Sequence, residues 1–188
     1  MRNLVLTITF SLLTIASLMA QRDQTMFGRG GLDITGAWGG SQIMLTSFGG
    51  EYSALQGGFG GVELNKGLFI GGGGFTSTTY NNLDQLGDNY EMSYGGLVVG
   101  YGLKSHKIIH PQVMLLVGGG WKQEQGVGRD NAFVVQPGLG VEMNVFRWFR
   151  IGVNGGYRIV LDDNASVDNT FSNGYGSVSF KFGWSWGR

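Results

Sequence analysis

Large apolar residues alternate with small or polar residues along the last third of the chain. A period of two is the pattern of a β-strand whose two faces lie in different environments. One face of these segments carries Val141, Ile151, Val153, Val178, Phe180, Phe182 and Trp184. The opposite face carries Glu142, Arg150, Asn154, Arg158 and Lys181. The alternation therefore predicts strands with one apolar and one polar face.

Similar stretches, rich in glycine, aromatic and β-branched residues and bounded by polar turn residues, recur about eight times. They cover residues 35–46, 52–64, 67–78, 90–103, 112–122, 132–145, 149–161 and 174–186. We therefore predict an all-β chain that forms a single antiparallel up-and-down β-barrel of about eight strands. The first five stretches contain so many glycines that the facing of their side chains stays open.

The content of charged residues indicates which face of the barrel points outward. Only 14% of the residues are Asp, Glu, Lys or Arg, whereas a surface in water carries about 25–35% of them. This shortage favours an apolar exterior in lipid around a small polar interior, as in transmembrane barrels. The seven apolar residues would then face lipid, and the five polar residues would form a network in the lumen. A soluble, lipocalin-like periplasmic barrel, with the faces exchanged, is the alternative.

The first twenty residues resemble an export signal. Met1, Arg2 and Asn3 precede an apolar run over residues 4–20, which matches the charged and hydrophobic regions of a signal peptide. We expect a signal peptide at 1–20 and a barrel domain at 21–188, exported to the cell outer membrane. Cleavage after Ala16 is an alternative. A transmembrane anchor is another, although the run is at the short end of the roughly 17–25 residues that span a bilayer.

The connections between the predicted strands differ in length. With both chain ends in the periplasm, short turns at 65–66, 104–111 and 146–148 fall on the periplasmic side, and loops at 47–51, 79–89, 123–131 and 162–173 fall outside. In the tight turn after residue 145, Val145 is expected opposite Phe149, and Asn144 opposite Arg150. The two histidines, His106 and His110, both lie in the turn 104–111. We expect them on its surface.

Proline and the large aromatic residues add two expectations. Pro137 lies inside a predicted strand and cannot donate to the ladder of hydrogen bonds, so it predicts a β-bulge. Tryptophan and tyrosine gather near the strand ends, which predicts aromatic belts at the two membrane surfaces. The periplasmic belt would comprise Trp148, Trp184 and Trp186, and the outer belt Tyr80, Tyr90 and Trp121.

Several stretches resemble the small outer-membrane β-barrel proteins of Bacteroidetes, a largely uncharacterised family. They are GGFGGVELNKGLFIGGGG at 57–74, GGLVVGYGL at 95–103, QVMLLVGGGW at 112–121, VVQPGLGVEMNVFRWFRIGVNGGYR at 134–158 and VSFKFGW at 178–184. The resemblance implies an outer-membrane barrel without an established reaction. The final strand is also similar to the signal that the barrel-assembly machinery recognises, except that Gly187 and Arg188 follow the last aromatic residue.

The remaining composition excludes several classes of function. The formal net charge is zero, so no basic surface for nucleic acid is expected. The chain has no cysteine, and we expect no catalytic residues, cofactor or metal site. The favoured function is structural, or contact with an unknown ligand through the outer loops. A lipid-modifying enzyme and a small-solute channel remain alternatives, although an eight-stranded barrel is narrow enough for side chains to fill it.

Overall fold

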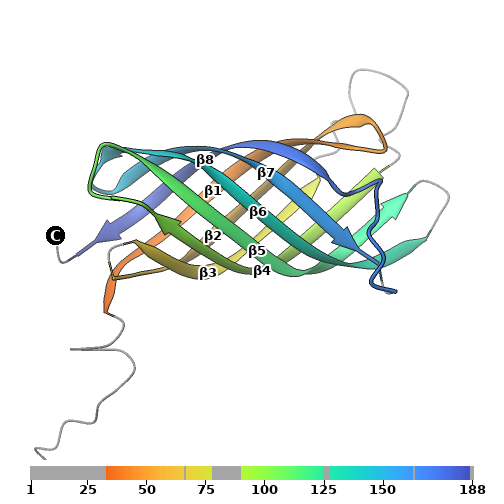
Figure 1. Cartoon of the computed structure of the whole chain (residues 1–188), viewed down its shortest axis with the longest axis horizontal. Coiled ribbons are helices and arrows are strands. Elements are labelled where there is room, and N and C mark those ends of the chain that lie inside the picture. Colours follow the sequence, from red (N-terminus) through yellow and green to blue (C-terminus); the bar gives the residue numbers. More distant parts are fainter. Residues whose placement is uncertain (1–32, 66, 78–89, 125–127, 163, 187–188) are drawn as a thin grey trace, which may run out of the picture. The chain divides into compact units, whose positions relative to one another are not determined.

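The computed structural model describes residues 33–65, 67–77, 90–124, 128–162 and 164–186. Within them the chain forms a closed antiparallel barrel in which each strand pairs with the next and β1 pairs with β8 (Figure 1). The strands are β1 (Ile34–Phe48), β2 (Glu51–Leu64), β3 (Leu68–Ser77), β4 (Tyr90–Gly102), β5 (Ile109–Glu124), β6 (Arg129–Phe146), β7 (Phe149–Leu161) and β8 (Asn173–Ser185). The predicted eight-stranded up-and-down barrel is confirmed. The predicted leader at 1–20 and the predicted loop at 79–89 lie outside the described residues.

The barrel has two ends that differ in their connections. The terminal end, where β1 begins and β8 ends, carries the short turns β2–β3, β4–β5 and β6–β7 (Figure 1). The loop end is the end where β1, β3, β5 and β7 finish, and its described connections include residues 49–50 between β1 and β2 and residues 164–172 between β7 and β8. No described residues form a helix long and apolar enough to cross a membrane.

The pairing of β6 with β7 corrects two predictions. Asn144 pairs with Arg150 as predicted, but an irregularity follows, so Phe146 instead of Val145 lies opposite Phe149. On the two sides of Pro137, Val135 pairs with Ile159 and Gly138 pairs with Gly156 in the same register. The predicted bulge is therefore wrong. A proline withholds one N–H without requiring an extra residue. Its carbonyl still accepts a hydrogen bond of 3.3 Å from the Tyr175 hydroxyl.

The register resolves the facing of the first five strands. Phe59, Val98 and Leu116, from the glycine-rich strands β2, β4 and β5, are buried inside the barrel. A Cβ at Gly96 or Gly118 would run into the backbone of the neighbouring strand. Glycine at these two positions therefore permits the tight curvature of a narrow barrel.

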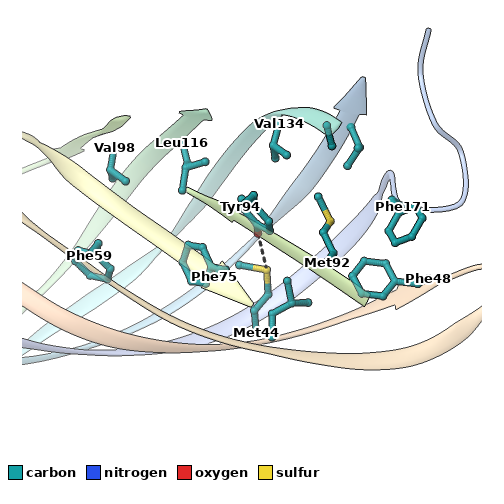
Figure 2. Close-up of a cluster of buried hydrophobic side chains, with 13 residues drawn as sticks. Met44, Phe48, Phe59, Phe75, Met92, Tyr94, Val98, Leu116, Val134 and Phe171 are labelled. Atoms are coloured by element: carbon teal, nitrogen blue, oxygen red, sulfur yellow. Dashed lines mark hydrogen bonds between the residues drawn. The ribbon is translucent and has the colours of Figure 1, made fainter. Parts of the chain in front are cut away.

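The loop-end half of the interior is apolar, which the sequence did not predict. Buried side chains from strands β1 to β7 and from the β7–β8 connection pack there as one group, hereafter the apolar cluster (Figure 2). Its members are Met44, Phe48, Leu55, Phe59, Phe75, Met92, Tyr94, Val98, Leu116, Ala132, Val134, Val160 and Phe171. The expectation of a small polar interior therefore holds only for the terminal-end half. Seven of the thirteen residues lie on the glycine-rich strands β2 to β5, whose facing the sequence left open.

Candidate functional site

The outer face of the barrel is apolar along its strands. Of the seven residues predicted to face lipid, five are exposed: Val141, Val153, Val178, Phe182 and Trp184. Ile151 and Phe180 lie on the same outer face but are partly covered by neighbours. The same pattern continues with exposed Ile43 and Leu45 in β1, Leu97 in β4, Val113 in β5 and Leu139 in β6. Large apolar side chains therefore cover the exterior, while the charged residues of the predicted network lie inside.

Aromatic rings gather on the exterior at the terminal end. Trp148 stacks on Phe146 with ring centroids 5.6 Å apart, and Phe149 lies 5.0 Å from Phe182. At the loop end, Trp121 lies on the outer face, and Arg129 packs on its ring at 3.8 Å. Tyr90 instead packs against Phe171 inside the barrel, so its place in an outer belt was wrong. Tyr80 lies outside the described residues.

Five ionisable side chains meet inside the terminal-end half of the barrel. This charged cluster consists of Glu63, His110, Glu142, Arg150 and Lys181. Glu142 is its centre: Oε1 accepts from Arg150 Nη1 at 3.1 Å, and Oε2 accepts from the Lys181 ammonium group. Glu142 is 1% exposed. A buried carboxylate needs such partners, because desolvation alone would disfavour its charge.

Glu63 forms the second acidic position of the charged cluster. Its Oε2 accepts hydrogen bonds from Trp38 Nε1 at 2.9 Å and from Ser185 Oγ at 2.8 Å, and it lies 3.7 Å from Arg150 Nη2. The Arg150 guanidinium also stacks on the Trp38 ring at 3.7 Å. Glu63 was missed in the sequence because its strand is rich in glycine and shows no clear alternation.

His110 also belongs to the charged cluster, which corrects the expectation of a surface role. It lies in β5, is 1% exposed, and places Nε2 at 3.3 Å from Glu142 Oε1. His106 is exposed in the β4–β5 turn, as expected. The predicted turn was too long: β5 begins at Ile109, and its inward face starts with His110.

Asn154 extends the polar interior toward the middle of the barrel. Lys181 donates to Gln112 Oε1 at 3.1 Å, and Gln112 donates in turn to Asn154 Oδ1 at 2.6 Å. The cavity left beside the charged cluster is about 30 Å³, which is room for one or two water molecules. This half of the interior is therefore filled by hydrogen-bonded side chains.

Arg158 lies apart from the other four residues of the predicted network. It is completely buried, its Nη2 donates to Thr46 Oγ1 and its Nε donates to the Phe171 carbonyl, both at 3.2 Å. Its guanidinium also lies 4.8 Å from the Phe48 ring centroid. Among the described residues no carboxylate forms an ion pair with it. Arg158 therefore lies among residues of the apolar cluster in the loop-end half, and not with the four polar residues with which it was expected to form a network.

The β7–β8 connection closes the loop end of the barrel. Phe171 is 2% exposed and packs against Phe48, with ring centroids 5.1 Å apart. The Lys122 ammonium group binds both Asp162 and Asp168 and so fastens this connection to β5. Burial alone would raise the pKa of Asp168, but Lys122 and the backbone amides of the connection outweigh it, so the pKa lies below its ordinary value.

The geometry bears on the enzyme and channel alternatives. Both His110 ring nitrogens face oxygens, Nδ1 at 3.2 Å from the Lys107 carbonyl and Nε2 beside Glu142. Along the described part of the barrel the interior is filled by side chains, with cavities of about 30 and 20 Å³ between them, and Phe171 is buried at the loop end.

The fold is that of known small outer-membrane barrels. Neisserial surface protein A superposes with a TM-score of 0.57 at 10% sequence identity, covering 83% of this chain and 99% of that protein. The attachment invasion locus protein of Yersinia pestis gives a TM-score of 0.46 at 12% identity, covering 81% and 99%. No family model and no curated protein sequence matches the chain. The likeness therefore establishes the fold, and the resemblance to the Bacteroidetes proteins stays an expectation.

Proposed function

We propose that this protein is a non-enzymatic, integral barrel of the outer membrane that acts structurally or as a contact protein through its loop end. One observation carries the proposal: the barrel is inside-out relative to a soluble protein. Glu142, Arg150 and Arg158 are buried in the interior, whereas Val153, Phe182 and Trp184 are exposed on the outside. In lipid this arrangement is favourable, because the apolar exterior meets acyl chains and closure satisfies the backbone hydrogen bonds.

The loop end supports the contact role. Tyr52 is 95% exposed there and Val167 is 54% exposed. The surface has a firm base, since Gly49 N–H donates to the Thr170 carbonyl at 3.0 Å and so connects the β1–β2 turn to the β7–β8 connection. A preordered surface loses little conformational freedom when it binds a partner.

The proposal includes the route to the membrane. The leader at residues 1–20 would direct export, and β8 would be presented to the barrel-assembly machinery, with outer-membrane lipid as the surrounding partner. The alternating outward residues of β8, among them Phe180, Phe182 and Trp184, support this role. The glycine-rich and alternating strand sequences, which resemble those of the Bacteroidetes barrels, support a relationship to that family.

Location and orientation can be tested together on intact cells. The chain has no cysteine, so Tyr52→Cys and Arg147→Cys each introduce a single thiol, at the loop end and the terminal end respectively. We expect a membrane-impermeant maleimide to label Tyr52→Cys only. The protein should also fractionate with the outer membrane and migrate differently on a gel before and after boiling. Release with the periplasm, or labelling of Arg147→Cys alone, would contradict the proposal.

A further inference from the structure

Two turns at the terminal end of the barrel carry exposed basic residues. Lys104 and Lys107 lie in the β4–β5 turn, and Arg147 lies in the β6–β7 turn. Within the described part of the chain, none of the three forms an ion pair with a carboxylate. Their positive charges are therefore available to an anionic partner.

Hydrogen bonds hold these two turns together. The Asn144 side chain, near the end of β6, donates to the Ser105 and Lys107 carbonyls at 2.9 and 2.6 Å. The Asn144 backbone N–H donates to the Ile108 carbonyl at 2.8 Å. Since Arg147 follows closely after Asn144, the β4–β5 and β6–β7 turns lie side by side (Figure 1). The three cations therefore occupy one side of the terminal end, hereafter the basic edge.

Exposed apolar side chains accompany the basic edge. Ile109 begins β5 and Phe146 ends β6, and both are exposed on the outer face. Lys107 and Arg147 lie beyond these strand ends, with the exposed Trp148 ring beside them. Apolar residues followed by cations along the barrel axis match the order of a bilayer, in which the headgroup phosphates lie outside the hydrocarbon.

We propose that the basic edge binds the headgroups of anionic phospholipids in the leaflet at the terminal end, an inference that rests on the membrane location proposed above. Lys104, Lys107 and Arg147 contact the phosphates, while Phe146 and Trp148 enter the acyl region beside them. A zwitterionic lipid binds less well, because its amine offsets the charge of its phosphate. Each basic residue near a membrane surface strengthens the attraction to anionic lipid about fivefold.

The backbone of Lys104 supports a role for its side chain. Its φ angle is 57°, in the left-handed region that glycine and asparagine adopt with less strain than lysine. A strained residue in a surface turn points to a function for the group it carries. Lys104→Asn therefore removes the charge and leaves a residue that suits the turn.

The described residues of the loop end carry the opposite charge. Glu51, Glu91 and Asp130 are exposed there, and Arg129 is an exposed cation among them. At the terminal end Asp33 is exposed, but it precedes β1, which pairs with β2 and β8. Asp33 therefore lies across the barrel from the basic edge. Charge complementarity to an anionic lipid is confined to one side of one end.

Fluorescence quenching by brominated phospholipids tests the inference. The folded protein is placed in vesicles of phosphatidylcholine and phosphatidylglycerol, with bromine on the acyl chains of one lipid at a time. The difference between the natural protein and Trp148→Phe gives the quenching of Trp148, the ring next to Arg147. We expect phosphatidylglycerol to be enriched about fivefold or more over phosphatidylcholine beside Trp148. Added salt should weaken this enrichment by screening the charges.

A variant that combines Lys104→Asn, Lys107→Gln and Arg147→Gln should lose the enrichment. Arg129→Gln, which removes an exposed cation at the loop end, is the matched control and should retain it. Equal quenching by the two lipids in the natural protein, or undiminished enrichment in the triple variant, would overturn the inference and leave the proposed function intact. Failure of the natural protein to insert into vesicles of either lipid would contradict the proposed function, and this inference with it.

Discussion

The two halves of the barrel interior are filled in different ways. At the terminal end, the charged cluster is held by ion pairs and hydrogen bonds centred on Glu142. At the loop end, the apolar cluster packs by shape, and a Tyr94 hydroxyl contact of 4.0 Å to the Met44 sulfur is one of its few polar links (Figure 2). Removing a member of a buried ion network leaves its partners uncompensated, whereas removing an apolar side chain leaves a cavity. The halves should therefore respond differently to substitution.

Glu142→Gln should have the largest effect on stability. The substitution keeps the volume but removes the negative charge that Arg150 and Lys181 share, and breaking a buried ion pair costs about 4 kcal/mol. We expect a loss of this size in the free energy of unfolding, measured by urea titration of the barrel in micelles. Glu51→Gln, at an exposed carboxylate in the β1–β2 turn region, serves as the control and should change little.

Arg158, the buried cation beside the apolar cluster, allows a comparison with Glu142→Gln. Arg158→Met removes a buried charge without leaving a described carboxylate unpaired, and methionine fills much of the same space. The loss should be well below that of Glu142→Gln, because hydrogen bonds to Thr46, Phe171 and the Met44 sulfur and the ring contact with Phe48 disappear, but no ion pair is broken among the described residues. Equal losses in the two variants would show that the halves do not differ as described.

Leu55→Ala tests packing in the apolar cluster. It should cause the second-largest loss in the free energy of unfolding, after Glu142→Gln. Leu55 is fully buried and faces Met44 across the β1–β2 pair. Truncating a buried leucine costs roughly 3 kcal/mol, part of which comes from the cavity that remains. Leu45→Ala is the matched control, because Leu45 is 65% exposed on the outer face of the same hairpin. It should cost less, since lipid or detergent closes over the gap.

The sequence predicted the strands far better than the contents of the barrel. Strands with strict alternation, such as β7, were placed to the residue, because a period of two and flanking turn residues specify both faces. In β2 to β5 glycine replaces many side chains, so the inward positions of Glu63, Phe59 and Val98 left no periodic signal. Seven of the thirteen members of the apolar cluster and two of the five members of the charged cluster, Glu63 and His110, come from these strands, so their facing could not be predicted.

His110 and Arg158 show a second limit of the sequence. His110 was assigned to a turn at 104–111, but the turn is shorter and β5 begins at Ile109. Arg158 shares the inward face with Glu142 and Arg150. Each strand, however, runs the whole length of the barrel, so inward-facing residues of one strand lie at different depths. Sharing a face does not place two residues at the same depth, and the depth came only from the register.

The smallest effect is expected at the loop end, where the β7–β8 connection covers the apolar cluster. Thr170 N–H donates to Asp168 Oδ1 at 2.8 Å, and Lys122 binds the same carboxylate group. Because the pKa of Asp168 is lowered in the folded protein, its contribution is present above the ordinary value of 3.8 and is lost as the pH falls below it. Acidification should therefore loosen this connection locally before the barrel unfolds.

Amide hydrogen exchange at Thr170 and Phe171 measures this loosening. Asp168→Asn should reduce their protection at neutral pH, because the neutral side chain no longer binds Lys122 as an ion pair, while the strands keep their protection. Asp130→Asn is the control at an exposed carboxylate of the loop end. Loss of protection in β1 or β6 of Asp168→Asn would mean that the connection is a part of the cooperative core. Protection unchanged in the connection would mean that its other contacts, among them the packing of Phe171 against Phe48, hold it in place without this ion pair.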